Sequence, residues 1–381
     1  MKNDAYIIAA KRTAVIPKGG AFKTLNIHEL AAPVIRALLK EANVPSTSIN
    51  EIILSNAVGG GGNPARPTAL AAGLPEHIGG FTIDRQCTGG LDAIWLAAQM
   101  VMSGSHNIII AGGSESASCR PIRMRINHNT GEKIAYDRPI FTGLKDRDPD
   151  MIDSVSEIAV SSGISKEAQE AWAINSHKKA SNTNFKSEIV NINNQNKDTF
   201  TRKLNKKICE RAPILKGNIS SATTAVDSDA AAFCIVVSEK VAKNFPNAIR
   251  IVHGVSSAGV PDTPAFATIN SINRILETTK ITIESLKVIE IMEAYSAQAI
   301  IAKNEFKFNE QLINRGGGAL ARGHPIGASG AILAVRLFHE LQKTDGNGLA
   351  TIAAAGGELT ARSEYSSPSL YRDSITDCSS R

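Results

Sequence analysis

The chain has 381 residues, of which 43% are hydrophobic and 20% charged, and its formal net charge is +6. That length is enough for more than one structural unit, and the composition is typical of a globular protein. No apolar run reaches the roughly 18 residues that span a bilayer, and the N-terminus lacks a signal-peptide pattern, so we expect no membrane association. The sequence has neither a Walker loop nor a Gly-x-Gly-x-x-Gly fingerprint after a strand, which disfavours nucleotide-hydrolysing and NAD-dependent enzymes.

The cysteines are few, odd in number and without the spacing of metal ligands. This usage predicts no metal site and a reducing, cytoplasmic environment. The five positions are Cys87, Cys119, Cys209, Cys234 and Cys378.

In chain order, the first informative elements lie on either side of Cys87, between a strand-like segment and a helix predicted over residues 91–102. A thiol at a helix N-terminus faces free N–H groups and the positive end of the helix dipole, so we expect a lowered pKa and thiolate character. The same N–H groups can hold an oxyanion, and strand, sharp turn and helix together form a nucleophile elbow. A buried structural cysteine is the alternative.

An insertion that differs in composition from the two halves is predicted over residues 120–217. It should contain helices over 151–162 and 165–183, a strand over 189–194 and mostly loop across 191–207. Ten Lys or Arg residues face only three acids between Lys178 and Lys216. Aromatic residues for base stacking are almost absent there, so we expect no nucleic-acid partner. A solvated loop face is the simpler interpretation.

The second informative segment, residues 316–330, places His324 in a turn bounded by glycine and proline. The His324-Pro325 pair keeps the histidine out of the helical region, at the mouth of a helix predicted over 328–341. An imidazole placed there can act as a general base near neutral pH, although a structural turn with an incidental histidine is the alternative. We also expect the chain to return to its first half at 220–239 and to form a pocket-lining loop over 254–268.

The chain contains an internally repeated pattern of turn, helix and strand. Cys87 is followed by a helix and by an apolar strand over residues 107–111 that ends at Gly112-Gly113. His324 is likewise followed by a helix and by a strand over 349–354 that ends at Gly356-Gly357. Apolar strands alternating with helices predict an α/β fold in two similar halves, with a parallel-type sheet covered on both faces. The nucleophile and the base would then meet across the junction of the halves.

Six sequence blocks, in order, resemble those of the thiolase family, from about residue 5 to about residue 357. They are Ile7-Ile8-Ala9-Ala10-Lys11-Arg12-Thr13, Asn63-Pro64-Ala65-Arg66, Asp84-Arg85-Gln86-Cys87, Gly112-Gly113-Ser114-Glu115-Ser116, Met292-Glu293-Ala294-Tyr295 and the turn around His324. The resemblance implies two duplicated α/β halves in a five-layer α/β/α/β/α sandwich. Its parts would be an N-terminal half (1–119 plus 218–245), an inserted loop domain covering coenzyme A (120–217), a C-terminal half (246–370) and a tail (371–381).

The resemblance also implies a mechanism. Cys87 would take an acyl group from a coenzyme A thioester, and His324 would accept its proton and then contribute to an oxyanion hole. Such covalent catalysis divides acyl transfer into two steps. Coenzyme A thioesters would be substrates, with no permanently bound cofactor, and some bases of the insertion could bind the nucleotide end. A homodimer or homotetramer is expected.

Three positions relate to altered parts of the family pattern. Ala353 stands where the family has a second cysteine that exchanges protons, and Met292 stands where it has an asparagine that holds an oxyanion-hole water. Methionine offers no comparable donor. The N–H of Ala355 could still serve a second oxyanion hole. The closing strand over 360–367 is polar where the family has an apolar one.

Three hypotheses follow. The first is a thiolase-type acyltransferase in which another group replaces the second cysteine. The second is a non-condensing acyltransferase to an oxygen or nitrogen acceptor, which needs no carbanion. The third is a weakly active partner subunit that binds coenzyme A, and the intact Cys87 and His324 motifs argue against it.

Overall fold

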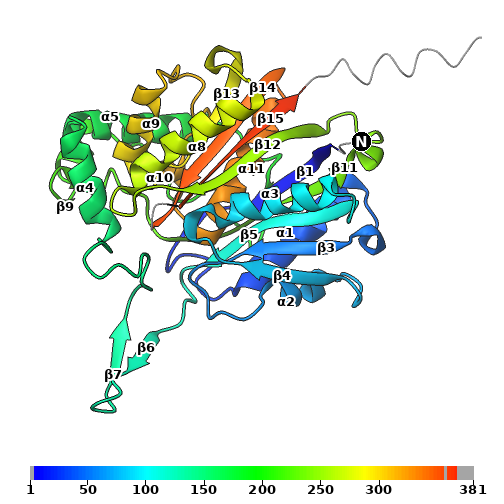
Figure 1. The fold of residues 1–381 in the computed structure, drawn as a ribbon, viewed down its shortest axis with the longest axis horizontal. Coiled ribbons are helices and arrows are strands. Elements are labelled where there is room, and N and C mark those ends of the chain that lie inside the picture. Colours follow the sequence, from blue (N-terminus) through cyan, green and yellow to red (C-terminus); the bar gives the residue numbers. More distant parts are fainter. Residues whose placement is uncertain (1–3, 356–357, 367–381) are drawn as a thin grey trace, which may run out of the picture.

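The computed structural model describes residues 4–355 and 358–366. Strands from both halves of the chain join in one mixed sheet (Figure 1). The strands of the N-terminal half are, in spatial order, β4 (Gly79–Ile83), β3 (Glu51–Ser55), β5 (Ile108–Ser116), β11 (Ser228–Ser238) and β1 (Ala5–Thr13). Those of the C-terminal half are β13 (Leu286–Ile291), β14 (Gly346–Ala353), β15 (Glu358–Ser366) and β12 (Ile249–Ala258).

The two halves of the sheet are joined where β1 runs antiparallel to β12. This contact consists of three residue pairs: Ala5 with Ile251, Tyr6 with Arg250 and Ile7 with Ile249. Parallel pairing occurs between β3 and both of its neighbours, and between β13 and β14, while β11 and β15 run antiparallel to the strands beside them. The expectation of a parallel-type sheet is therefore wrong in part, because each half contains an antiparallel return strand.

Helices cover and separate the two halves, giving the five layers expected from the sequence (Figure 1). The outer helices α1 (Ile27–Ala42) and α2 (Ala65–Ala71) pack on the N-terminal strands. The helices α8 (Pro264–Thr279) and α9 (Ser296–Glu305) cover the C-terminal side. Between the halves lie α3 (Gly89–Met102) and α11 (Ile326–Leu341), which contact strands of both. Helix α1 begins with a capping box in which Asn26 and Glu29 satisfy each other's backbone N–H groups.

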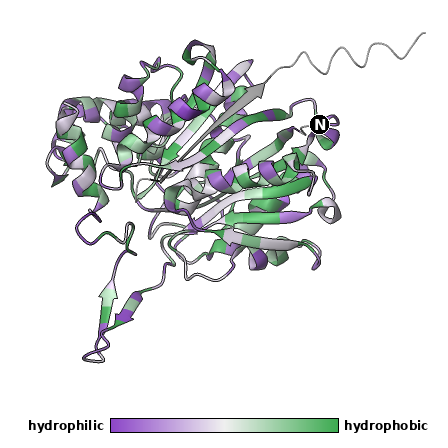
Figure 2. Cartoon of the chain, in the orientation of Figure 1, coloured by the Kyte–Doolittle hydropathy of each residue, from purple (hydrophilic) through white to green (hydrophobic). Residues whose placement is uncertain are grey.

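Apolar side chains fill the spaces between these layers. The central core surrounds α3 and α11, a second core lies under α1, and a third lies between α8, α9 and the insertion. Hydrophobic residues are concentrated along the strands, whereas the outer helices alternate polar and apolar faces (Figure 2). No helix in the described parts of the chain combines the length and the apolar character that crossing a bilayer requires.

The insertion contains the helices expected from the sequence. They are α4 (Met151–Ser161) and α5 (Lys166–Ser181), and the Oγ of Ser165 caps α5 by accepting from Ala168 N at 3.2 Å. The hairpin of β6 (Arg123–Ile126) and β7 (Lys133–Tyr136) extends away from the body (Figure 1). The remaining elements of the chain are β2 (Ile16–Pro17), β8 (Ile189–Val190), α6 (Lys206–Glu210), β9 (Ile214–Lys216), β10 (Ile219–Ser220), α7 (Glu239–Ala242) and α10 (Ala319–Arg322).

Buried charges attach the insertion to the two halves. Arg12 of β1 donates to Glu188 at 2.7 Å and to Asp198 at 2.7 Å, and Glu188 also pairs with Arg336 of α11. The ring of Phe185 lies within 5.2 Å of both guanidinium carbons. Burial alone would raise the pKa of Glu188, but the charges of Arg12 and Arg336 lower it to about 2. The carboxylate therefore remains ionised at neutral pH and links the three parts of the chain.

Several predicted boundaries are wrong. Gly112 and Gly113 do not end a strand, since β5 continues to Ser116. An added Cβ would lie 2.0 Å from Ala232 O at Gly112 and 2.1 Å from Gly327 O at Gly113, so these glycines permit close backbone approach.

Residues 254–268 form a loop only over 259–263, because the range also contains the end of β12 and the start of α8. Its first three residues, Gly254, Val255 and Ser256, do line a cavity. Only glycine fits at position 254, because a Cβ there would lie 2.4 Å from the indole of Trp95. The strand expected over 189–194 is limited to β8, because Asn193 and Asn194 have φ angles of 49° and 62°.

The C-terminal expectations have mixed outcomes. The polar segment over 360–367 largely coincides with β15, which pairs with β14 on one side and with β12 on the other. Backbone pairing thus forms this strand without an apolar sequence. Gly356-Gly357 and the tail over 371–381 lie outside the described residues.

Candidate active site

Cys87 lies in the tight turn that connects β4 to α3. This 3₁₀ turn spans Gln86–Thr88, and Gln86 has a φ of 50°, an uncommon value for a residue with a side chain. The Oδ1 of Asp84 accepts from Gln86 N at 2.9 Å, and the hydroxyl of Thr88 donates to Arg85 O at 2.8 Å. These hydrogen bonds hold the strand, turn and helix in the elbow arrangement expected from the sequence.

His324 lies at the start of α11, in the turn that precedes it. Its backbone N donates to Val226 O at 2.7 Å, and it forms a bridge with Asp227. The Nε2 atom lies 3.2 Å from Cys87 Sγ, so the two residues singled out from the sequence are in direct contact. The predicted meeting of a nucleophile and a base from different halves is thus present in the structure.

Ser329 fixes the orientation of this imidazole. Its Oγ lies 2.6 Å from His324 Nδ1 and also donates its proton to Pro325 O at 2.9 Å. Because a hydroxyl has a single proton, Ser329 accepts from Nδ1–H, which leaves Nε2 with a free lone pair. That lone pair faces the thiol of Cys87, which is the tautomer that a general base requires. The sequence reasoning missed Ser329, although its position one turn into the helix after His324 was a usable signal.

Both members of the pair are neutral in the free protein. Burial, together with the charges of Glu115 and Asp84, raises the pKa of the Cys87 thiol to about 12. Burial lowers the pKa of His324 to about 4. The expected thiolate is therefore wrong for the resting site, because the dry environment outweighs the helix N-terminus. The thiol must transfer its proton to Nε2 when substrate arrives.

The backbones of α3 and α11 touch beside the site. A Cβ added at Gly90 would lie 2.6 Å from Ala331 N, and one at Gly330 would lie 2.5 Å from Leu91 N. No side chain separates the two helices at this point, so the helix that carries Cys87 and the helix that follows His324 are held at a fixed separation.

Glu115 holds the turn after His324 in place through hydrogen bonds. Its carboxylate accepts from the backbone N of Gly327 at 2.8 Å, from Ala57 and Val58, and from the side chain of Asn56 at 2.6 Å. Burial raises the pKa of Glu115 to about 7, against the opposing effect of those N–H donors. The residue belongs to a block quoted above, but nothing in the sequence indicated that it holds the turn after His324.

The three altered positions are all buried. Met292 is 1% exposed within the central core, and its backbone N donates to Thr351 O at 3.0 Å. Ala353 at the end of β14 packs against Ala267, and Ala355 follows two residues later. Neither Met292 nor Ala353 places a polar side-chain atom in the site.

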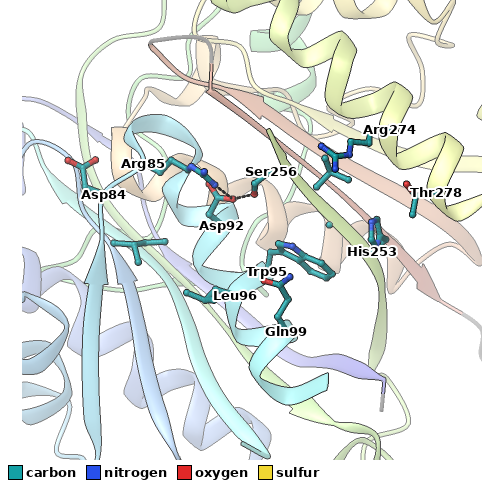
Figure 3. A pocket seen from close by; sticks show the side chains of 13 residues that line it. Asp84, Arg85, Asp92, Trp95, Leu96, Gln99, His253, Ser256, Arg274 and Thr278 are labelled. Atoms are coloured by element: carbon teal, nitrogen blue, oxygen red, sulfur yellow. Dashed lines mark hydrogen bonds and ion pairs between the residues drawn. The ribbon is translucent and has the colours of Figure 1, made fainter. Parts of the chain in front are cut away.

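A cavity of about 660 Å³ lies next to the turn that carries Cys87 but is not lined by Cys87 or His324 (Figure 3). Its walls come from the segment before Cys87, from α3, from β12 and from α8, with Arg274 and Trp95 facing each other across it. Arg85 pairs with Asp92 at 3.4 Å, and Ser256 of β12 donates to the same carboxylate. This network connects the base of the turn to the C-terminal half.

Several bases of the insertion already have partners within the protein. Lys179 donates to Glu310 O at 3.0 Å and to Ile313 O at 2.8 Å, and Lys216 pairs with Asp153 at 2.9 Å. Arg202 lies over the ring of Phe200 at 4.2 Å. In the described part of the chain, no group of three His, Cys, Asp or Glu side chains is arranged to hold a metal ion.

A half-buried cysteine whose proton can pass to an oriented, neutral histidine defines a site for covalent acyl transfer of the Cys–His class. The family description "Thiolase, N-terminal domain" matches residues 5–240, and "Thiolase, C-terminal domain" matches residues 246–363. The chain therefore belongs to the thiolase family, as its resemblance indicated, and it is an acyl-CoA acyltransferase with the thiolase fold.

Individual relatives agree with this assignment. The chain is 33% identical to the "Putative acetyl-CoA C-acetyltransferase VraB" of Staphylococcus aureus over 371 residues, covering 93% of this chain and 97% of the relative. A "Probable acetyl-CoA acyltransferase" of S. aureus is also 33% identical over 381 residues, with the same coverage.

Two solved structures are similar throughout. An acetyl-CoA acetyltransferase from Bacillus anthracis has a TM-score of 0.88 and 26% identity, covering 96% of this chain and 99% of that one. The Acat5 thiolase of Ascaris suum, solved with coenzyme A, has a TM-score of 0.88 and 26% identity, with coverage of 96% and 100%.

Proposed function

We propose that the protein takes an acyl group from a coenzyme A thioester onto the Sγ of Cys87, with His324 as general base. The observation that supports this is the 3.2 Å contact between Sγ and Nε2, together with the Ser329 contact that keeps Nε2 unprotonated. When the thioester carbonyl approaches, the thiol proton passes to Nε2 and sulfur attacks the carbonyl carbon. Coenzyme A leaves as the thiol by taking that proton from Nε2, and the acyl group remains on Cys87.

The developing oxyanion needs donors in the same dry site. The backbone N–H of Cys87 itself is the nearest candidate donor, because those of Thr88 and Gly89 already donate to Arg85 O and Gln86 O. A backbone donor keeps its function whatever side chain it carries. The N–H of Ala355 is the corresponding candidate for a second oxyanion. Met292 provides no side-chain donor, so the first oxyanion hole depends on backbone groups and on His324 after protonation.

The substrate class and the surroundings follow from the relatives. Both S. aureus proteins are named for acetyl-CoA acyl transfer, and the Ascaris thiolase structure contains coenzyme A. We assign residues 120–217 as the loop domain over coenzyme A, between an N-terminal half (1–119 plus 218–245) and a C-terminal half (246–370). A homodimer or homotetramer and a cytoplasmic location fit a family enzyme whose four described cysteines are unpaired.

A second acceptor class is favoured by two specific positions. Ala353 stands in place of the thiol that the family uses at the α-carbon, and Met292 stands in place of the amide that holds an oxyanion-hole water. An acyltransferase that passes the acyl group to an oxygen or nitrogen nucleophile needs no carbanion and can function without them. The two functions share the acyl-Cys87 intermediate and differ in what attacks it.

Intact-mass measurement after incubation with acetyl-CoA tests the shared step. We expect a single acetyl adduct on wild type, none on Cys87→Ala, and an unchanged adduct on Cys119→Ala, which removes an exposed cysteine. Absence of the adduct from wild type would overturn both functions and leave the role of a partner subunit. Cleavage of acetoacetyl-CoA with added coenzyme A then separates carbon–carbon chemistry from transfer to oxygen or nitrogen.

A further inference from the structure

The Cys87–His324 pair can move one proton, but cleavage of a carbon–carbon bond needs a second. Once His324 has taken the thiol proton, that proton must return to Cys87 when the acyl group leaves. The carbanion released from a 3-ketoacyl thioester therefore requires a separate acid. Such an acid must lie near Cys87 and carry a proton that it does not already donate in a hydrogen bond.

Most polar groups around Cys87 already take part in hydrogen bonds within the protein. Glu115 accepts from several N–H donors, and Asp84 accepts from Gln86 N. The hydroxyl of Thr88 donates to Arg85 O, and that of Ser329 donates to Pro325 O. The carboxylate of Asp227 is half-exposed and pairs with Arg120 at 3.9 Å.

Tyr295 has a hydroxyl without such a commitment. It is the N-cap residue of α9, and its phenol makes no hydrogen bond with any residue that the structure describes. Burial makes the largest contribution to raising the pKa of this phenol to about 12, and the charges of Cys87, Asp227 and Asp150 contribute the rest. The phenol is therefore protonated at neutral pH and lies within electrostatic reach of the nucleophile.

Backbone pairing places Tyr295 beside the catalytic histidine. Residues 224–227 run between the two: Thr224 bridges to Tyr295, and Asp227 bridges to His324. The N of Ala225 donates to Ala294 O at 2.9 Å, next to these bridges. Ala225 and Ala294 pack against the same central core as Cys87, and Tyr295 packs against the third core, between α8, α9 and the insertion. The bridging segment thus places Tyr295 where these two cores meet, close to the backbone of His324.

We propose that the hydroxyl of Tyr295 is the second proton-transfer group of this site and protonates the carbanion formed when a 3-ketoacyl-CoA is cleaved. The inference rests on the proposed function, because it requires the acyl-Cys87 intermediate.

The protons and electrons balance over the cycle. In the first half, the Cys87 proton passes to Nε2, sulfur attacks the keto carbon, and the bond between the α- and β-carbons breaks. The electron pair of that bond takes the phenol proton, which releases acetyl-CoA and leaves a phenolate. In the second half, the thiol of free coenzyme A gives its proton to the phenolate and attacks acyl-Cys87. The Cys87 sulfur leaves and recovers its proton from His324.

The test compares Tyr295→Phe with wild type in two assays. Acetyl adduct formation on Cys87 should be unchanged, because it uses only His324. Cleavage of acetoacetyl-CoA with coenzyme A should fall by about 10²-fold or more in kcat, the usual scale for losing a general acid. Tyr136→Phe, which removes an exposed hydroxyl from β7, should leave both assays unchanged.

A rescue variant separates catalysis from packing. Ala353→Cys placed in the Tyr295→Phe background should recover cleavage, because it returns a transferable proton to the same site. Equal cleavage by Tyr295→Phe and wild type would overturn the inference, as would a wild type that forms the adduct but never cleaves acetoacetyl-CoA. In both cases the proposed function survives. Loss of the adduct in wild type would instead overturn the proposed function itself.

Discussion

Gly330 of α11 lies directly against Leu91 of α3, so that a methyl group on Gly330 would lie 2.5 Å from the Leu91 nitrogen. Leu91 is four residues after Cys87, and Gly330 is six residues after His324. The distance between nucleophile and base is therefore set by a contact between helix backbones and not by flexible side chains.

Gly330→Ala should force the two central helices apart. We expect a loss of about 1–3 kcal/mol in the free energy of unfolding, the usual cost of overpacking, and slower acylation of Cys87. Thermal melts and intact-mass time courses measure the two effects. Gly60→Ala is the matched control, because a Cβ there meets nothing within 4 Å. Equal melting temperatures for both variants would contradict a backbone contact at Gly330.

Ser329→Ala should leave His324 Nδ1 without its partner and allow the wrong tautomer. Leaving a buried polar group unpaired costs about 1–3 kcal/mol, which corresponds to a roughly 5- to 150-fold slower acylation if it acts on the transition state. Pre-steady-state acylation by acetyl-CoA is the measurement. Ser271→Ala removes another buried helical hydroxyl, which donates to Thr268 O at 3.0 Å, and should not change the acylation rate. A similar rate loss in both variants would indicate a general effect of stability.

In Glu115→Gln, which removes the neighbouring charge that titrates near pH 7, the reactivity of Cys87 toward iodoacetamide should show no inflection between pH 5 and 8. Burial raises the pKa of the thiol to about 12 and lowers the pKa of His324 to about 4, so neither group titrates in this range. Alkylation should be slow near pH 8 and should accelerate only as pH approaches the thiol pKa. Peptide mass spectrometry follows Cys87, with exposed Cys119 as the internal reference. An inflection near pH 6–7 would instead indicate a thiolate–imidazolium pair.

Glu188→Gln should destabilise the fold strongly, because it leaves Arg12 and Arg336 buried with less negative charge. Removing one partner of a buried ion pair typically costs about 3–5 kcal/mol. The pKa of Glu188 is lowered to about 2, so its contribution is complete above the ordinary carboxyl pKa and is lost as pH falls toward 2. Urea unfolding at pH 7 and pH 3 should therefore show a smaller difference at the lower pH.

Glu239→Gln is the surface comparison for that experiment. Its partner Lys243 lies 3.6 Å away, and both side chains are largely exposed. Exposed pairs contribute about 0–1 kcal/mol, so this variant should unfold nearly as wild type does. A comparable loss in the two variants would mean that burial of Glu188 has no energetic consequence.

The elements that could be predicted from the sequence were those with local signals. Ser165 before α5, and the proline after His324, marked helix starts because capping and backbone restriction depend on neighbouring residues. Gly112, Gly113 and Gly254 were misinterpreted as breaks, because their reason lies in a distant backbone or indole that fills the space of a Cβ. Local sequence contains no record of such contacts.

The site shows the same division. Cys87 and His324 could be found because each stands in a distinctive turn before a helix. Glu115 could not be assigned a role, since its hydrogen bond to Gly327 exists only after the halves have met. Ser329 contacts His324 within the same turn, and this local signal was missed. The neutral state of the pair also depended on burial in the assembled core, which reversed the charge expected from the helix dipole.

Helix α11 contacts β1, β5 and β11 of the N-terminal half and carries the base at its start. During synthesis, a ribosome completes Cys87 and most of the first sheet long before it reaches residue 326. Until then, the inner face of that sheet has no α11 to cover it, and the thiol has no proton acceptor. The nascent chain therefore cannot acylate Cys87 with the help of His324. The helix that completes the core also brings in the residue that accepts the proton.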